Sequence, residues 1–346
     1  MAAVTPIGLD IGSMSIRAVE TGRSKDGPVI TKFGQVMLPL GVVQGGVIQN
    51  DRVVTDQLRQ LWSTFRFRTR EVVLGVTNTQ IVVREMAVAN LPRRELRKSL
   101  PFQVRELLPL PLDQALLDFT PLEDPGGKPT VRGLMIAAPK EAVLTAVRAC
   151  ERAGLRVTGV DLASFALLRA TARLDEQVEA IVDIGAYATS LIVHHDGEPL
   201  IVRTIPRGGA EVTEQLANRL NTNLGAAETL KRRTGLWDDE EPEVAEIVQH
   251  AIRPLINELR TSFTYLTSAG RQATVTRLVL AGGGALLPGL VDALSEALDI
   301  DVQLADPVLR IREPRTGRTG RGSPQVSLDR VRTAAAVSIG LTLGAA

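Results

Sequence analysis

Two segments of this chain repeat one pattern: an apolar strand, an Asp-Ile-Gly turn followed by small residues, and a second apolar strand. The first copy occupies residues 6–20 with its turn at 10–12, and the second occupies residues 180–193 with its turn at 183–185. Repeats this far apart indicate two halves of related architecture. The repeat therefore predicts an α/β protein whose two halves face each other across a cleft.

A glycine-rich loop follows the second repeat. An apolar strand ends at residue 281, Gly282, Gly283 and Gly284 follow it, and a helix is expected to begin after Gly289. Glycine permits positive φ and lets a polyanion approach backbone N–H groups closely. Two Asp-Gly turns and one glycine-rich loop together predict a nucleotide clamp.

The side chains of the first turn suit a metal-bound polyphosphate. The hydroxyl groups of Ser13 and Ser15 can donate to phosphate oxygens, and the Arg17 guanidinium can bind them from the next strand. A carboxylate repels phosphate, so Asp10 and Asp183 are expected to accept hydrogen bonds from waters on Mg²⁺, which keeps most of its hydration shell. A single turn of this kind is equally consistent with an ordinary hairpin. The set of three loops favours the nucleotide site.

Other nucleotide-binding motifs do not occur in the sequence. It contains no G-x-x-x-x-G-K-[ST] segment, and the run at Gly282 lacks the third glycine and the following acidic residue of a dinucleotide fold. Charge is balanced, with 40 Lys and Arg against 39 Asp and Glu, and aromatic residues make up only 3% of the chain. Balanced charge and few aromatic side chains argue against nucleic acid as a partner.

The cysteine and histidine content predicts neither a disulfide framework nor a metal cluster. The single Cys150 lies on an apolar helical pattern, which predicts a small buried side chain and a reducing compartment. The three histidines lack metal-ligand spacing, and the sequence shows neither a signal peptide nor an apolar run long enough to span a membrane. Membrane association is therefore expected to come through a partner, without a direct membrane span.

Residues 79–155 differ in character from the segments around them. They contain a strand, a charged amphipathic helix over 93–107, a proline-punctuated segment, two more strands and the helix of Cys150. The apolar pattern of the first half resumes at residue 156. This change predicts a subdomain inserted into the first half of the chain.

Together these motifs resemble the actin-like ATPase superfamily, and within it the family of the type IV pilus assembly protein PilM and its cell-division relative FtsA. Residues 8–17 resemble the first phosphate loop of the superfamily, 183–190 the second, and 281–289 the adenosine loop. Further resemblance lies in the FtsA and PilM turn at 205–209, the nucleotide-side helix at 225–231, the closing helix at 333–341, and the PilM-like segments 100–113 and 117–119.

The resemblance implies an actin-like ATPase fold, a duplicated ribonuclease H-like architecture with two domains around a nucleotide cleft and an inserted subdomain of the FtsA and PilM type. The implied units are a first core (1–78 and 156–178), a partner-binding insertion (79–155), a second domain (179–330) with a helical subdomain at about 210–268, and a closing helix (331–346) that returns to the first domain.

The resemblance also implies bound ATP and Mg²⁺, with Glu228 on the ribose and Lys231 by the adenine. Asp10 and Asp183 are expected to hold the metal ion through water. The residues expected to bind ATP are Asp10, Gly12, Ser13, Met14, Ser15, Arg17, Asp183, Gly185, Ala186, Gly208, Gly209, Glu228, Lys231, Gly282, Gly283 and Gly284.

Two positions bear on hydrolysis. Ala186 stands where actin and its close relatives carry a second acidic residue, so one group that would order water is missing. Asp161 lies near the place where superfamily members put a residue that orients the attacking nucleophile, although its position also suits a cap of the following helix. We therefore expect ATP binding with weak or absent ATPase activity and name Asp161 as the catalytic candidate.

By the same resemblance, the protein is expected to be a cytoplasmic scaffold of type IV pilus assembly, peripheral at the inner face of the cell membrane. The groove where the insertion meets the first domain is expected to hold the N-terminal tail of a PilN-like membrane protein. An FtsA-like cytoskeletal protein and a small-metabolite kinase remain alternatives, and self-association is left open. The basic segment 310–323 is expected to form a surface loop or to contact acidic lipid headgroups.

Overall fold

The computed structural model describes residues 5–25, 27–124, 126–237, 240–268, 273–307, 311 and 328–344. Of the basic segment 310–323, all residues except Ile311 lie outside this described part. No helix within the described ranges is long and apolar enough to cross a membrane.

The first half of the chain forms a five-stranded mixed sheet in the order β10-β6-β1-β2-β3. Strands β1, β2 and β3 form an antiparallel meander, and β6 and β10 extend the sheet in parallel from β1. The strands are β1 (Ile7–Ile11), β2 (Ser15–Ser24), β3 (Gly27–Met37), β6 (Glu71–Val76) and β10 (Arg156–Leu162).

The second half repeats this topology. Its sheet has the order β13-β12-β11-β14-β15, in which β11, β12 and β13 form the antiparallel meander and β14 and β15 continue in parallel. The strands are β11 (Val178–Ile184), β12 (Thr189–His195), β13 (Glu198–Ile205), β14 (Arg277–Ala281) and β15 (Asp301–Leu304). The duplication predicted from the two Asp-Ile-Gly segments is confirmed.

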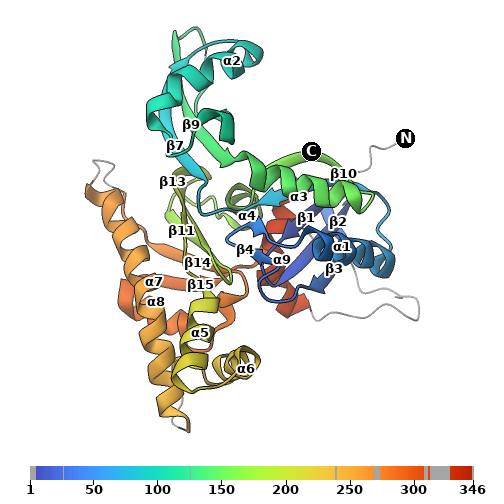
Figure 1. Cartoon of the computed structure of the whole chain (residues 1–346). Coiled ribbons are helices and arrows are strands. Elements are labelled where there is room, and N and C mark those ends of the chain that lie inside the picture. Colours follow the sequence, from blue (N-terminus) through green and yellow to red (C-terminus); the bar gives the residue numbers. More distant parts are fainter. Residues whose placement is uncertain are drawn as a thin grey trace.

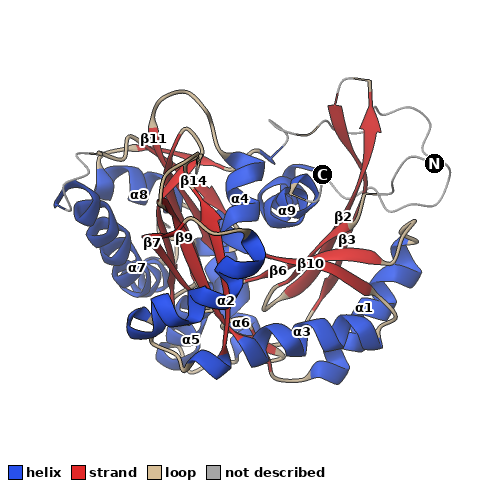
Figure 2. Cartoon of the chain, turned by 90° about the horizontal axis from the view of Figure 1, so that it is seen from above, coloured by secondary structure: helices blue, strands red, loops and turns tan. Residues whose placement is uncertain are grey.

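Helices cover the outer face of each sheet, and two helices lie between the sheets (Figure 2). Helices α1 (Asp51–Phe65) and α3 (Lys140–Arg152) join one core cluster with the first sheet. Helices α4 (Ala163–Thr171) and α9 (Leu328–Leu343) share a cluster with strands of both sheets. The helices of the second half are α5 (Gly209–Arg219), α6 (Leu224–Thr234), α7 (Pro242–Ser268) and α8 (Leu290–Leu298).

The boundaries of α1 follow from local sequence. The Asn50 side chain caps its first turn by accepting a hydrogen bond from the Val53 amide at 3.2 Å. The helix ends at Arg66, which adopts a left-handed conformation with φ of 49°. Between these ends, Val54, Leu58, Leu61 and Trp62 recur at helical spacing and are buried against the first sheet.

Two glycines allow α9 to lie directly against its neighbours. A Cβ atom on Gly8 of β1 would lie 1.9 Å from the Ser338 carbonyl oxygen of α9. A Cβ atom on Gly340 of α9 would lie 1.7 Å from the Ala166 carbonyl oxygen of α4. Both distances are far inside van der Waals contact, so a larger residue at either position would push α9 away.

The insertion contains a three-stranded antiparallel sheet in the order β7-β9-β8 (Figure 1). Its strands are β7 (Val82–Ala89), β8 (Ala115–Pro121) and β9 (Thr130–Pro139). Helix α2 (Arg93–Val104) buries Leu100 and Val104 against this sheet, and short 3-10 helices follow at Arg105–Leu107 and Leu112–Gln114. The insertion thus has its own small core.

Helix α3 also lies within the interval 79–155, but it packs on the first core. Its buried Ala149 and Cys150 belong to the core cluster of the first sheet, and α3 lies against α1. The interval 79–155 therefore combines the three-stranded sheet with a helix that covers the first core. Cys150 is buried as predicted, and burial raises the pKa of its thiol to about 12. The proposed division of the chain at residues 79 and 155 stays a prediction.

Candidate functional site

The two Asp-Ile-Gly turns have the same geometry. In the turn between β1 and β2, the Gly12 amide donates to the Ser15 carbonyl at 3.0 Å. In the turn between β11 and β12, the Gly185 amide donates to the Ala188 carbonyl at 3.0 Å. Each turn follows a strand that carries an aspartate near its carboxyl end, so the duplication places Asp10 and Asp183 at equivalent positions.

Strand alternation turns both aspartates toward the space between the sheets. Ile7 and Leu9 point into the core under α1, so Asp10 faces the opposite side of the first sheet. In the second half, Ala180 and Val182 point into the outer core, so Asp183 likewise faces inward. The two carboxylates consequently approach each other from opposite sheets.

The pKa values of Asp10 and Asp183 reflect the proximity of the two carboxylates. Burial raises the pKa of Asp183 to about 6, and the nearby Asp10 carboxylate adds to the shift. Burial also raises the pKa of Asp10, while Arg17 acts in the opposite direction. The Arg17 Nη1 atom lies 3.2 Å from Asp10 Oδ2. Two facing carboxylates, of which one pairs with a guanidinium, favour a bound cation at this position.

Two polar atoms beside this pair have no partner. Ser15 Oγ and Arg17 Nε are buried, and neither forms a hydrogen bond. Buried polar groups without partners are rare in proteins, so a pair of them at one place indicates a missing ligand. Within the described ranges, no group of three or more Asp, Glu, His or Cys side chains could hold a metal ion directly. Mg²⁺ held through water and phosphate fits this set of residues.

The loop before α5 lies against the second turn. The Gly209 amide donates to the Gly185 carbonyl at 2.9 Å, and the Ala210 amide donates to the Ala186 carbonyl at 2.8 Å. A Cβ atom on Gly208 would lie 2.5 Å from the Gly185 carbonyl oxygen. Four residues predicted to bind ATP, Gly185, Ala186, Gly208 and Gly209, therefore lie side by side.

Glu228 and Lys231 extend this group from α6. Lys231 Nζ donates to the Gly209 carbonyl at 3.0 Å and lies 2.5 Å from Glu228 Oε2. Burial lowers the pKa of Lys231 against the effect of Glu228. Burial would raise the pKa of Glu228, but hydrogen bonds from Lys231 and Thr213 outweigh it and lower that pKa. Thr213 accepts from Lys231 at 2.8 Å and donates to Glu228 at 2.6 Å, a role that no sequence motif marked.

The glycine-rich loop covers the other side of the second turn. Gly282 has φ of 82°, and a Cβ atom there would lie 2.1 Å from Asp183 Oδ1. A Cβ atom on Gly284 would lie 2.3 Å from Ile184 Cγ2, whereas Gly283 borders open space. The Gly282 amide also donates to the Thr333 carbonyl of α9 at 3.3 Å. The loop thus needs glycine both for its backbone conformation and for its approach to Asp183.

Backbone contacts hold the remaining residues of the first turn. Ser13 and Met14 form the bend between β1 and β2, and the Met14 carbonyl accepts from the Leu38 amide at 2.9 Å. A Cβ atom on Gly12 would lie 3.2 Å from the Ser15 carbonyl oxygen. These contacts fix the turn that directly follows Asp10.

Asp161 lies at the end of β10 and pairs with a residue of α4. It lies in the same row of the first sheet as Asp10, with Gly75 between them, and its carboxylate forms an ion pair with Arg169. Arg169 Nε also donates to the Gly340 carbonyl at 3.1 Å. The alternative of a helix cap is wrong, because the N-cap position of α4 is Leu162 and no side chain caps it.

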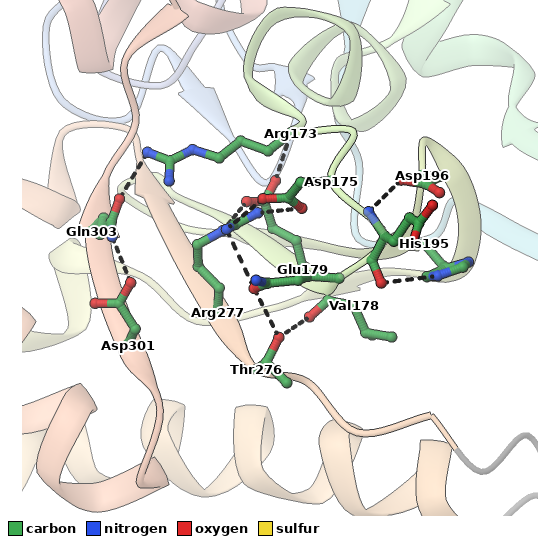
Figure 3. Close-up of polar contacts among 12 residues, drawn as sticks. Arg173, Asp175, Val178, Glu179, His195, Asp196, Thr276, Arg277, Asp301 and Gln303 are labelled. Carbon is green, nitrogen blue, oxygen red and sulfur yellow. Dashed lines mark hydrogen bonds and ion pairs between the residues drawn. The ribbon is translucent and has the colours of Figure 1, made fainter.

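A partly buried ionic network holds the linker between the two halves (Figure 3). Arg277 Nε donates to Glu179 Oε2 at 2.6 Å, and the Arg277 Nη atoms bind both oxygens of Asp175 at 2.9 and 3.0 Å. His194 Nε2 lies 3.0 Å from Glu179 Oε1, and its Nδ1 accepts from the Gly197 amide. With Nδ1 accepting from Gly197, Nε2 is the ring nitrogen that donates to Glu179.

The two sheets of identical topology, with an aspartate turn from each facing the other, define an actin-like ATPase fold. The structure of MreB5 of Spiroplasma citri bound to AMPPNP shares this fold, with a TM-score of 0.52 at 14% identity over 86% of this chain and 90% of that one. The cell division protein FtsA of Bacillus subtilis is 24% identical over 89% of this chain and 80% of its own length.

A closer likeness includes the insertion. The structure of a PilM-PilN type IV pilus biogenesis complex matches 99% of this chain and 98% of its counterpart, with a TM-score of 0.87 and 27% identity. The family model of the type IV pilus assembly protein PilM matches residues 8–345. The chain belongs to the PilM family of type IV pilus assembly proteins.

Proposed function

We propose that this protein is an ATP-binding scaffold of the type IV pilus assembly complex that holds the N-terminal tail of a PilN-like membrane protein. The likeness to the PilM-PilN complex over nearly the whole chain carries this proposal. By this proposal the protein lies in the cytoplasm at the inner face of the cell membrane and reaches the membrane through that partner.

The proposed ATP site lies between the two sheets. The phosphates would contact the two aspartate turns, with Mg²⁺ held through water by Asp10 and Asp183. The unpartnered Ser15 Oγ and Arg17 Nε support a phosphate group beside the first turn. Gly283 of the glycine-rich loop borders open space, which supports the close approach of a nucleotide to this part of the loop.

Weak or absent hydrolysis follows from the side chains near the proposed phosphates. Ala186 offers no carboxylate in the second turn, and Asp161 is held by Arg169. A water that attacks the terminal phosphate needs a group to orient it. We therefore expect ATP to act mainly as a ligand that joins the two halves and stabilises the closed arrangement by mass action.

We place the partner peptide along a narrow groove where the first core meets the start of the insertion. Its walls come from the end of β1, the small hairpin β4 (Val43–Gln44) and β5 (Val47–Ile48), residues 75–81, and α3. The side chains that line it are mostly apolar: Ile11, Val43, Ile48, Val76, Ile81, Pro139, Ala142, Val143 and Ala146. An extended peptide with alternating apolar residues suits such a groove.

The groove and the proposed ATP site share one strand. Ile11 lines the groove, and the next residue, Gly12, belongs to the first phosphate turn. Nucleotide that fixes this turn would also fix one wall of the groove. We therefore expect the peptide to bind more tightly when ATP is present.

The test is titration of a labelled N-terminal peptide of a PilN-like protein into the full chain with Mg·ATP. We expect a Kd of about micromolar, because the peptide orders on binding. Ala142→Glu places a charge in the groove and should weaken binding about tenfold or more. Ala87→Glu, the same change at an exposed position of β7, is the matched control. Equal binding by the two variants, or no binding by the unmodified chain, would contradict the proposal.

The similarity to the cell division protein FtsA favours one second candidate, an FtsA-like cytoskeletal or cell-division protein, which we expect to form filaments. Sedimentation of the protein with and without Mg·ATP distinguishes it from a scaffold. Nucleotide-dependent pelleting without any peptide binding would favour the filament.

A further inference from the structure

Helix α2 presents a basic face that the proposed function does not use. The helix and the 3-10 turn after it carry Arg93, Arg94, Arg97, Lys98 and Arg105, and all five side chains are exposed. None of the five forms an ion pair within the described part of the chain. Only two carboxylates, Glu95 and Glu106, share this segment. The segment also lies outside the walls of the peptide groove.

Helical spacing turns Arg94, Lys98 and Arg105 away from the buried side, whereas Arg97 lies on its flank. Leu100 and Val104 point into the core of the insertion. Arg94, Lys98 and Phe102 follow one another at intervals of four residues along the opposite side of the helix. Figure 1 shows α2 at the outer end of the insertion, away from both five-stranded sheets, so this side faces outward.

Local helix stability does not account for the cations. Arg93 and Arg94 lie in the first turn of α2, where the helix dipole favours acidic residues and disfavours positive charge. The N-cap position is Pro92, and no side chain caps the first turn. Two arginines at the positive end of an uncapped helix weaken that helix. Their presence there points to a role in binding.

Phe102 lies within this charged face. Its exposed fraction is 83%, the highest of the large exposed hydrophobic side chains among the described residues. Lys98 and Arg105 lie on one side of the ring, and Glu95 and Glu106 lie on the other. A ring at the edge of a row of cations on a convex helix suits a planar anionic surface, where the ring enters the headgroup region and the cations meet lipid phosphates. A binding site for an acidic peptide would instead gather its charges around a groove.

We propose that this face of α2, formed by Arg94, Arg97, Lys98, Phe102 and Arg105, docks directly on an anionic lipid surface. The contact is separate from the peptide groove. It adds a second attachment to the membrane and fixes which way the insertion points. Two weak attachments on one molecule act together, so the combined retention at a membrane exceeds that of either alone.

Co-sedimentation of the full chain with vesicles tests the proposal without any peptide. We expect binding to phosphatidylcholine vesicles that contain about one third phosphatidylglycerol, and no binding to phosphatidylcholine alone. Each lost cation should weaken binding about fivefold, so the triple variant Arg94→Gln, Arg97→Gln, Lys98→Gln should lose about two orders of magnitude. The control variant Arg52→Gln, Arg219→Gln, Arg253→Gln removes the same charge from exposed sites on α1, α5 and α7 and should bind normally.

A second variant reports on the aromatic ring. Phe102→Trp should show a blue shift of tryptophan emission with anionic vesicles, because the ring leaves water. Equal losses in the two triple variants, or no blue shift with vesicles that bind the protein, would overturn the proposal. Binding to soluble polyglutamate as tight as to the vesicles would also overturn it and would favour an acidic protein partner. Peptide binding by the α2 variants reports separately on the proposed scaffold function.

Discussion

Arg277→Met tests the network that holds the linker between the halves. The Glu179 side chain is fully buried, and the Arg277 side chain is 7% exposed. Loss of the arginine leaves a buried carboxylate with two neutral donors, the His194 ring and the Arg173 amide. Removing one partner of a buried ion pair costs about 3–5 kcal/mol. We expect a loss of that size in the free energy of unfolding near neutral pH.

The loss of Arg277 removes one of the groups that favour the charged form of Glu179. The substitution should therefore raise the pKa of Glu179. In the unmodified protein this pKa is lowered, because hydrogen bonds from His194, the Arg173 amide and Arg277 outweigh the opposing effect of burial.

The pKa shift of Glu179 sets how the loss in unfolding free energy depends on pH. A carboxylate with a lowered folded pKa contributes stability above its unfolded pKa and loses it as pH falls through the folded pKa. In the variant, Glu179 takes up a proton at higher pH, and the penalty for its charge disappears below that pH. The difference in unfolding free energy between the two proteins should therefore be largest near pH 7 and shrink toward about pH 4.

Urea unfolding followed by circular dichroism at several pH values measures this difference. Arg203→Met is the matched control, because Arg203 pairs with Glu258 at 2.7 Å at an exposed site. Exposed pairs contribute about 0–1 kcal/mol. The double variant Arg277→Met, Glu179→Gln should recover much of the loss, since no buried charge remains. Equal losses in the Arg277 and Arg203 variants, or a loss independent of pH, would refute the reasoning.

The sequence predicted the sheets and the loops of the candidate site because both depend on local patterns. Alternating apolar residues fix which face of β1 and β11 is buried, and this places Asp10 and Asp183 on inward faces. The glycine run at 282–284 marked a loop in the sequence. The structure gives the reason for glycine at 282 and 284, because the backbone there approaches a neighbour too closely for any side chain. That ATP and Mg²⁺ bind there stays a prediction.

Other features depend on contacts between distant segments. The pairing of Asp161 with Arg169 could not be read from a motif, because the aspartate's position at a strand-to-helix junction suits a cap equally well. The packing of α3 on the first core depends on which sheet its apolar face meets, and periodicity does not specify that. Thr213 was missed because its partners, Glu228 and Lys231, come from a different helix.

Three further predictions concern the space between the sheets. Gly340→Ala should lower the free energy of unfolding by about 2 kcal/mol or more, because its Cβ would overlap the Ala166 carbonyl, and thermal unfolding measures the loss. Asp10→Ala should weaken Mg·ATP binding about tenfold or more in calorimetry, whereas ATP binding without Mg²⁺ should change little. The last prediction concerns Asp183, whose pKa lies at about 6 because it is buried beside the Asp10 carboxylate. A metal ion favours the charged carboxylate, so Mg·ATP binding should lower that pKa and release a proton. The apparent affinity for Mg·ATP should therefore fall as pH drops below about 6. Calorimetry in buffers of different ionisation enthalpy counts the released proton, and Asp183→Asn should abolish it. Proton release that is equal in the unmodified protein and the Asp183→Asn variant would mean that Asp183 is not the group that responds to the metal ion.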